Sequence, residues 1–270
     1  MWRNEASDNL FVQSFDMNGD ALTEKVEIYT PNSSSSGKDF IADLDQLSNG
    51  SLIVTVENKK TGGISTEILD APPQVATTDG PTELVPTMVT ALDPSYFVKA
   101  DGSRLLAFTS SDNAGEGIWV QQYSAEGLPD GPITRVSDET TTAYFWGGDP
   151  KLTMVGTDFV VVWKDQSDGL VGRKLDSQGQ PNGDIFSFGE RESDGTATNA
   201  IKEHEVTVLS DNSFIVVWNA SGPSTTTQDV YAQRFEISTD APTLGMVVEV
   251  DTAPFLVNTS DIGWQHTPDV

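Results

Sequence analysis

The sequence predicts an all-β chain built from a repeated unit of four short strands. Three observations support this fold class. A strand-like segment recurs about every 54 residues, the apolar segments are only about four to six residues long and rich in β-branched residues, and no stretch shows the apolar spacing of a helix. Turn-forming pairs such as Asn-Gly and Asp-Gly separate the segments, as expected for hairpins.

The most regular element of the unit is a continuous apolar segment. Its copies end at Val56, Phe108, Trp163 and Trp218, so that successive copies lie 52, 55 and 55 residues apart. Because apolar residues follow one another without alternation, we expect both faces of this strand to be buried. We also expect Trp163 and Trp218, which end two copies in register, to be core residues. The copies span residues 51–56, 103–108, 158–163 and 213–218.

The other strands of the unit flank this segment. One strand follows it after a polar loop, another follows that strand after a turn, and a further one precedes the apolar segment. The strand after the loop is expected at residues 10–15, 64–69, 118–123, 170–175 and 230–235. The strand before the apolar segment is expected at residues 42–47, 94–98, 151–155 and 205–209.

A four-stranded unit of this length cannot bury a core alone, but repeated units can stack face to face around an axis. We therefore predict a β-propeller-like fold of about five four-stranded blades, in a single repeat domain over residues 1–270. An open array of β modules is the alternative. The last repeat is incomplete and is expected to close with the N-terminus, or else the chain is a piece of a longer array. The approximate repeats are 2–56, 57–108, 109–163, 164–218 and 219–270.

Charge and composition exclude several classes of function. The chain has 41 acidic and 15 basic residues and a formal net charge of −26, which repels nucleic acid and anionic membranes. The longest apolar runs span about five residues, whereas a membrane-spanning helix needs roughly 20. We therefore predict no nucleic-acid partner and no membrane insertion. The absence of Cys excludes disulfides, thiolate metal sites and Cys nucleophiles.

One segment has the ligand spacing of a calcium loop. Oxygen-bearing side chains fall at its positions 1, 3, 5, 9 and 12, which predicts calcium as a cofactor. An ordinary solvated hairpin turn is the other interpretation. It is favoured because Ala21 stands where the EF-hand pattern needs Gly, and because residues 176–179 fill the equivalent place without the later acids. The candidate metal ligands are Asp16, Asn18, Asp20, Glu24 and Glu27.

Three aromatic residues lie outside the repeat register and are candidates for ligand binding. Tyr144 and Trp146 lie in one long connection, and Trp264 lies in another. Connections longer than their repeat requires often carry binding residues, and aromatic side chains there could stack on a sugar or hold a peptide. Burial of these side chains under their loops is the alternative.

Catalytic patterns are weaker. No Ser-His-Asp order, phosphate loop or dinucleotide fingerprint appears, and we interpret His204, between Glu203 and Glu205, as a surface histidine. Glycosidase chemistry needs two carboxylates facing each other across a sugar. Asp43, Asp45, Asp149 and Glu205 occur near the expected innermost strands, but nothing in the repeat singles out a pair, so the sequence favours a non-catalytic protein.

The repeat resembles one found in very large secreted bacterial proteins. Two parts of it, residues 158–163 with 170–181 and residues 211–218 with 230–235, are similar to a repeat of RTX-type adhesins and toxins and of cadherin-like surface proteins. The resemblance implies a propeller-like extracellular or cell-surface module in a calcium-rich setting, without catalytic residues. The glycine-rich nonapeptides that bind calcium in RTX proteins are absent.

We therefore expect a non-catalytic extracellular module of a large bacterial secreted or surface protein, acting in adhesion or ligand binding or as a spacer, and stabilised by calcium. Its expected partners are carbohydrate or protein on a target surface and neighbouring domains of a longer chain. The alternative is a glycoside hydrolase or lyase on a five-bladed propeller. A third interpretation is an acidic scaffold that only keeps other domains apart.

Overall fold

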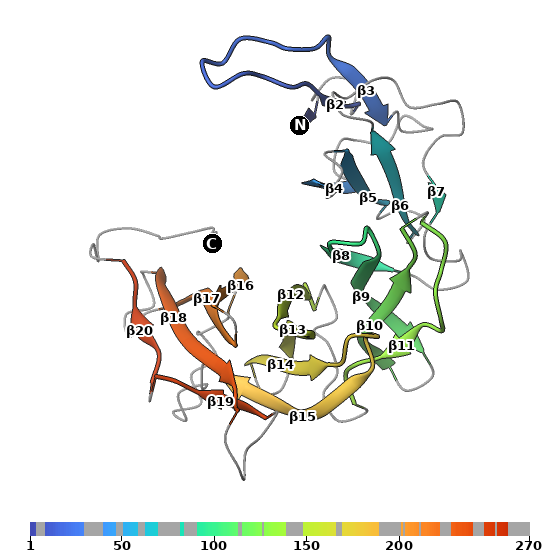
Figure 1. Cartoon of the computed structure of the whole chain (residues 1–270). Coiled ribbons are helices and arrows are strands. Elements are labelled where there is room, and N and C mark those ends of the chain that lie inside the picture. Colours follow the sequence, from blue (N-terminus) through green and yellow to red (C-terminus); the bar gives the residue numbers. More distant parts are fainter. Residues whose placement is uncertain are drawn as a thin grey trace. The chain divides into compact units, whose positions relative to one another are not determined.

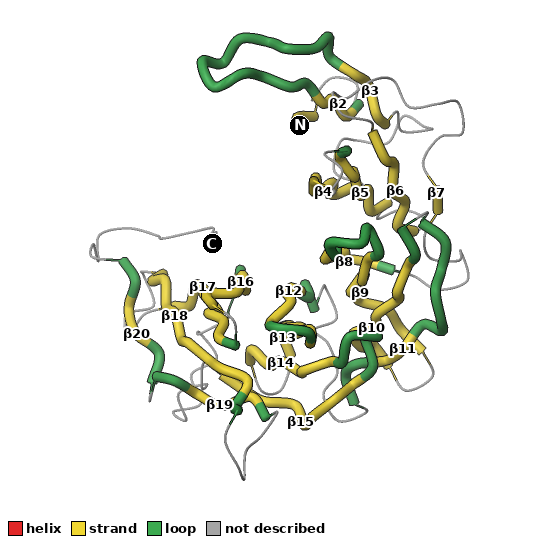
Figure 2. The backbone as a smooth tube through the Cα atoms, in the orientation of Figure 1, coloured by secondary structure: helices red, strands yellow, loops and turns green. Residues whose placement is uncertain are grey.

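The computed structural model is built from strands. All regular secondary structure in the residues that it describes is β, and none of these residues lies in a helix (Figure 2). No helix long and apolar enough to cross a membrane occurs among them. The described residues are 1–3, 9–29, 40–46, 51–58, 63–69, 82–83, 91–112, 115–125, 127–138, 148–165, 169–188, 201, 203–210, 212–221, 228–239, 246–251 and 253–258.

These residues form two compact units. The first comprises Met1–Pro94, Val98–Arg104 and Tyr123–Asp130, and the second comprises the intervening segments and all residues from Gly131 onward. Five antiparallel sheets are described, three of them four-stranded as the repeat predicts, and Figure 1 labels strands β2 to β20. In four of the sheets, strands that follow one another in sequence are neighbours in the sheet, and in the fifth this holds for all strands except the last.

The first unit contains two of these sheets. One pairs β1 (Trp2–Arg3), β2 (Leu10–Val12) and β3 (Val26–Tyr29) in that order. Apolar side chains of β2 and β3 pack with those of the next sheet to form a core. The strands of that next sheet are β4 (Phe40–Gln46), β5 (Leu52–Asn58), β6 (Gly63–Leu69) and β7 (Thr82–Glu83).

The sheet that follows contains residues of both units. Its strands, in the order β11-β10-β9-β8, include a short last strand that pairs with β10. They are β8 (Leu92–Val98), β9 (Arg104–Asp112), β10 (Gly115–Tyr123) and β11 (Thr134–Arg135).

The second unit contains the two best-defined repeats. One sheet is β12 (Lys151–Val155), β13 (Asp158–Asp165), β14 (Gly169–Leu175) and β15 (Pro181–Phe188). In the other, β18 pairs with both short strands that follow it. Its strands are β16 (His204–Ser210), β17 (Ser213–Ser221), β18 (Gln228–Ile237), β19 (Val247–Glu249) and β20 (Phe255–Leu256).

Strand β13 explains why the apolar segment shows no alternation. Phe159, Val161 and Trp163 join a core with side chains of β9, β10 and β14, whereas Val160 and Val162 join a second core with side chains of β17. Successive side chains of a strand point to opposite faces, so each face packs against a different neighbour. All five are fully buried, which confirms the prediction of burial on both faces. Trp218 is also buried, as predicted.

Candidate functional site

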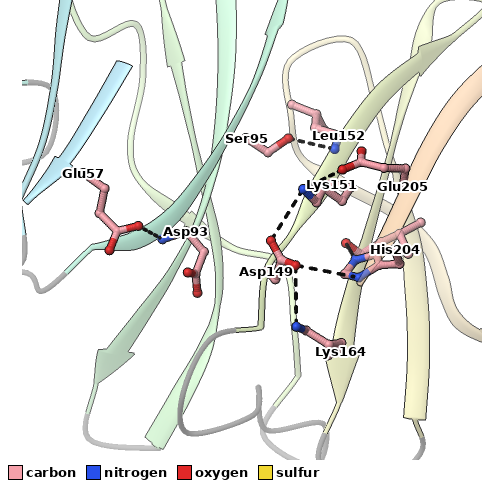
Figure 3. Close-up of polar contacts among 10 residues, drawn as sticks. Glu57, Asp93, Ser95, Asp149, Lys151, Leu152, Lys164, His204 and Glu205 are labelled. Carbon is pink, nitrogen blue, oxygen red and sulfur yellow. Dashed lines mark hydrogen bonds and ion pairs between the residues drawn. The ribbon is translucent and has the colours of Figure 1, made fainter. Parts of the chain in front are cut away.

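Polar side chains gather where the first strands of the last two sheets begin. Asp149 precedes β12, Lys151 begins β12, and His204 and Glu205 begin β16 (Figure 3). Lys164, near the end of β13, completes the cluster. The cluster lies within the second unit, beside buried Leu152 of β12 and Val206 of β16.

Asp149 has a strained backbone. Its φ is 46°, in the left-handed region that L-residues other than Gly, Asn and Asp rarely adopt, and the following residue is Pro150. A residue before proline is normally extended, which makes this conformation more unusual. The Lys164 amide donates a hydrogen bond to the Gly148 carbonyl (2.8 Å) and so ties the segment to β13. Strained residues held by their surroundings cluster at functional sites, so the conformation marks Asp149 as a candidate.

The same feature occurs once more, in the first unit. Asp93 has a φ of 51° and precedes Pro94, and its amide donates to Glu57 Oε2 at 2.7 Å (Figure 3). Glu57 is fully buried and lies directly after the apolar segment of β5. Asp-Pro therefore marks the first strand of two different sheets.

Ion pairs connect the two strands at the cluster. Lys151 Nζ lies 2.8 Å from Glu205 Oε1 and 3.6 Å from Asp149 Oδ1, so one ammonium group bridges the two carboxylates. Lys164 Nζ lies 3.5 Å from Asp149 Oδ2. About a third of each carboxylate side chain is exposed, 31% for Asp149 and 34% for Glu205. Both carboxylates can therefore be reached from solvent.

The surroundings of Asp149 favour its ionised form. Burial alone would raise the pKa of this carboxyl, but His204, Lys151 and Lys164 together hold the pKa below its ordinary value of 3.8. Because burial lowers the pKa of His204 to about 4, its imidazole is uncharged at neutral pH. At that pH the positive charges of Lys151 and Lys164 stabilise the Asp149 carboxylate. Asp149 is thus a carboxylate base at neutral pH.

His204 is buried, which corrects our interpretation of it as a surface histidine. Its side chain has no exposed area, Nδ1 lies 4.0 Å from Asp149 Oδ2, and Nε2 lies 3.5 Å from the Val162 carbonyl oxygen. The physical reason is the parity of the strand. His204 falls on the same face as buried Val206, while Glu205 falls on the other face.

The arrangement provides the groups for acid–base chemistry on a bond between the two strands. The sum of the two Lys151 distances, 6.4 Å, is the largest possible separation of Asp149 Oδ1 and Glu205 Oε1. In retaining glycosidases the two carboxyl groups lie about 5 to 5.5 Å apart, a spacing that falls within this limit. Asp149 and Glu205 were among the four acids that the sequence placed near these strands. For Asp43 and Asp45 the structure gives the backbone, on β4, but not the side chains.

The predicted calcium ligands form an ordinary turn. Asp16 Oδ1 accepts hydrogen bonds from the amides of Asn18 and Asp20, both at 2.9 Å. Asp176 Oδ1 accepts the same two bonds, also at 2.9 Å, from Gln178 and Gln180 in a turn without the later acids.

Calcium binding by this segment stays a prediction, and these hydrogen bonds favour the ordinary turn. The carboxylate of its first residue stabilises the turn, and Glu24 and Glu27 are exposed side chains. No group of three or more His, Cys, Asp or Glu in the described part of the chain could hold a metal ion. The candidate ligands concerned were Asp16, Asn18, Asp20, Glu24 and Glu27.

The three predicted ligand-binding aromatics, Tyr144, Trp146 and Trp264, lie outside the described residues. Their role stays a prediction.

Sequence reasoning missed the lysines of the cluster, although a signal was present. The residue directly after the apolar segment is polar in every copy but differs from copy to copy: Glu57, Thr109, Lys164 and Asn219. A position with a purely structural role would tend to keep one residue type. Asn219 shows what the position does in another sheet, where its amide donates to Glu203 Oε2 at 3.2 Å. The residue directly after the apolar segment therefore places a polar group beside the beginning of the first strand of a sheet.

No protein-family model matches the chain, and no curated protein matches it. Solved structures do match. The α-L-arabinofuranosidase Arb93A of Fusarium graminearum is 16% identical with a TM-score of 0.58, over 87% of this chain and 71% of that one. The α-L-arabinanase of Penicillium chrysogenum, in complex with arabinobiose, is 16% identical with a TM-score of 0.55, over 83% and 70%. These likenesses confirm the predicted β-propeller-like fold.

The comparisons also correct the functional interpretation. The similar structures are glycoside hydrolases, and no RTX-type adhesin or cadherin-like protein is among those reported above. The interpretation as a non-catalytic adhesion or spacer module built from calcium-binding RTX-type repeats is therefore wrong. Both neighbours carry names of enzymes that act on arabinose-containing carbohydrate.

Proposed function

We propose that the protein is a glycoside hydrolase that uses Asp149 and Glu205 as its two carboxyl groups. The observation that carries this proposal is the position of the two side chains, on adjoining first strands and bridged by Lys151. The likeness in fold to carbohydrate-cleaving propellers supports it. Each carboxylate is also exposed enough for a sugar to reach it.

The two carboxyl groups take different roles. Asp149 contacts two lysines, which keep it ionised, so it is the group that acts as base or nucleophile. Glu205, which pairs with Lys151, is then the proton donor to the leaving-group oxygen.

A variant series tests this proposal. The protein is incubated with arabinan, arabinobiose and a panel of other polysaccharides, and release of reducing ends is measured. Asp149→Asn and Glu205→Gln remove one carboxylate each without changing side-chain size. We expect each to lower kcat by roughly 10²-fold or more.

Asp158→Asn is the matched control. Asp158 is an aspartate of the same sheet that also pairs with a lysine, Lys174, at 3.0 Å, and its side chain is 25% exposed. It lies outside the cluster, so we expect its activity to match the wild type. Absence of activity on every substrate, or an equal loss in all three variants, would contradict the proposed function.

The expected extracellular or cell-surface location becomes part of this proposal, because polysaccharides of this kind lie outside cells. Detection of the protein in the secreted or surface fraction of the producing cells tests it, and a protein found only inside the cells would contradict it.

A further inference from the structure

The imidazole of His204 is a buried polar group aimed at the carboxylate of Asp149. Its side chain has no exposed area, and Nδ1, which faces Asp149 Oδ2 at 4.0 Å, has no hydrogen-bond partner among the described residues. The other ring nitrogen, Nε2, lies 3.5 Å from the Val162 carbonyl oxygen (Figure 3 shows the ring beside Asp149).

A purely structural role does not account for this ring. Burying a polar atom without a partner carries the desolvation penalty of that atom, whereas an apolar side chain would carry none. Val206, two residues further along the same face of β16, is an apolar side chain buried in the same way. A buried group that lacks a partner calls for an explanation, and a catalytic role is one of the recognised ones.

The neighbours of the ring decide where its proton lies. A neutral imidazole has one N–H donor, and both groups that face its nitrogens, the Val162 carbonyl and the Asp149 carboxylate, are acceptors. No hydrogen bond forms at 4.0 Å, but a carboxylate there attracts an N–H and repels a nitrogen lone pair, while the neutral Val162 carbonyl oxygen, at 3.5 Å, lies at the limit of a hydrogen bond. The proton therefore belongs on Nδ1, facing Asp149.

The distance fits a bond that closes during the reaction. An N–H···O bond is about 2.9 Å long, so a shift of the carboxylate by roughly 1 Å would form it. Catalytic hydrogen bonds are often long in the free enzyme and tighten when substrate binds.

We propose that His204 is a positioning residue for Asp149, and that its Nδ1–H donates to Asp149 Oδ2 and fixes the carboxylate in the orientation in which it acts on the sugar. This inference rests on the proposed function. The charged groups that face the ring are Asp149, Lys151 and Lys164. Because the two lysines already supply positive charge, a neutral donor orients the carboxylate without weakening it further as a base.

Two conservative variants of His204 separate positioning from packing. The amide of Asn reaches the place of Nδ1, whereas the amide of Gln reaches the place of Nε2. His204→Asn therefore keeps a donor toward Asp149 and loses the contact with Val162. His204→Gln keeps the contact with Val162 and loses the donor toward Asp149. A packing role alone would make the two variants equally active.

We expect His204→Gln to lower kcat roughly tenfold to a hundredfold with little change in KM, because misplacing a catalytic group by about 1 Å can cost that much. We expect His204→Asn to stay within about threefold of the wild type, within the two- to threefold context dependence of single contacts. Equal activities, or a larger loss in His204→Asn, would overturn the inference. The midpoint of urea unfolding, measured for both, shows that each variant is folded.

A second measurement needs neither catalysis nor a variant. The ¹⁵N chemical shifts of the His204 ring in the wild type report which nitrogen carries the proton. We expect the Nδ1–H form at pH 7.5, and the Nε2–H form would overturn the inference. Because this result does not depend on substrate cleavage, it stands apart from the test of the proposed function. If the protein shows the Nδ1–H form but cleaves no substrate, the inferred contact between His204 and Asp149 stands and the proposed hydrolase function is contradicted.

Discussion

The buried imidazole of His204 makes the stability of the protein depend on pH. Burial lowers the pKa of this ring from 6.5 to about 4, and Lys164 and Lys151 act in the same direction, while Asp149 opposes them. Between these two values the unfolded chain binds a proton that the folded protein does not bind. Stability is therefore lost as the pH falls through this window, and it is restored as the pH rises to 6.5.

The magnitude follows from the size of the shift. Each pKa unit corresponds to about 1.4 kcal/mol, so a fall from 6.5 to about 4 predicts a loss of about 3 kcal/mol in the free energy of unfolding. Above pH 6.5 the ring is neutral in both states, and below about pH 4 it is protonated in both, so no further change is expected outside the window.

The assay compares the wild type with His204→Asn. Urea unfolding at pH 7.5 and pH 4.5 gives the stability lost by each protein, and the difference between the two losses isolates the ring. Asp149, whose pKa lies below 3.8 in the wild type, stays ionised there at both pH values. We expect the wild type to lose about 2 to 3 kcal/mol more than the variant. Equal losses would show that His204 is protonated in the folded protein and would refute the argument from burial.

Three other outcomes follow from the structure. Gly172→Ala should lower the free energy of unfolding by about 1 to 3 kcal/mol, because the added Cβ would lie 2.6 Å from Phe186 Cζ and 3.0 Å from the Val161 carbonyl oxygen; an unchanged urea midpoint would contradict this. Excess calcium should leave the thermal melting temperature equal to that in chelator, because the Asp16 carboxylate already accepts hydrogen bonds from the amides of its own turn. A higher melting temperature with calcium would show that the segment binds calcium. Arg234→Gln should lower the urea midpoint slightly, because it removes a bidentate pair with Asp251 (2.6 and 3.0 Å) whose guanidinium is about half exposed. An unchanged midpoint would show that the pair does not stabilise the sheet.

The repeat predicted much of the fold because it records packing directly. The four apolar segments became β5, β9, β13 and β17, and the segments before them became the first strands of four sheets. Each copy repeats the same physical demand, which is a largely buried central strand, and the two faces of β13 pack in two different cores. Four repeats of one pattern outweigh the ambiguity of any single short apolar run.

The site was harder to predict because it depends on contacts between different copies. Asp149 and Glu205 belong to neighbouring repeats and meet through Lys151, a pairing that no spacing within one repeat contains. The left-handed backbone of Asp149 is invisible in the sequence apart from the following proline. By contrast, the burial of His204 could have been predicted from the alternation of faces along the strand, because His204 lies two residues before the apolar Val206 and so on the same face.

The central claim is that Asp149 and Glu205 act together on one glycosidic bond. The most direct test compares kcat of the double variant Asp149→Asn/Glu205→Gln with that of each single variant, on the substrate that the wild type cleaves. Residues that act as a unit are strongly non-additive, so we expect the double variant to be about as slow as the slower single variant. Losses that multiply, or single variants as active as the wild type, would contradict the account.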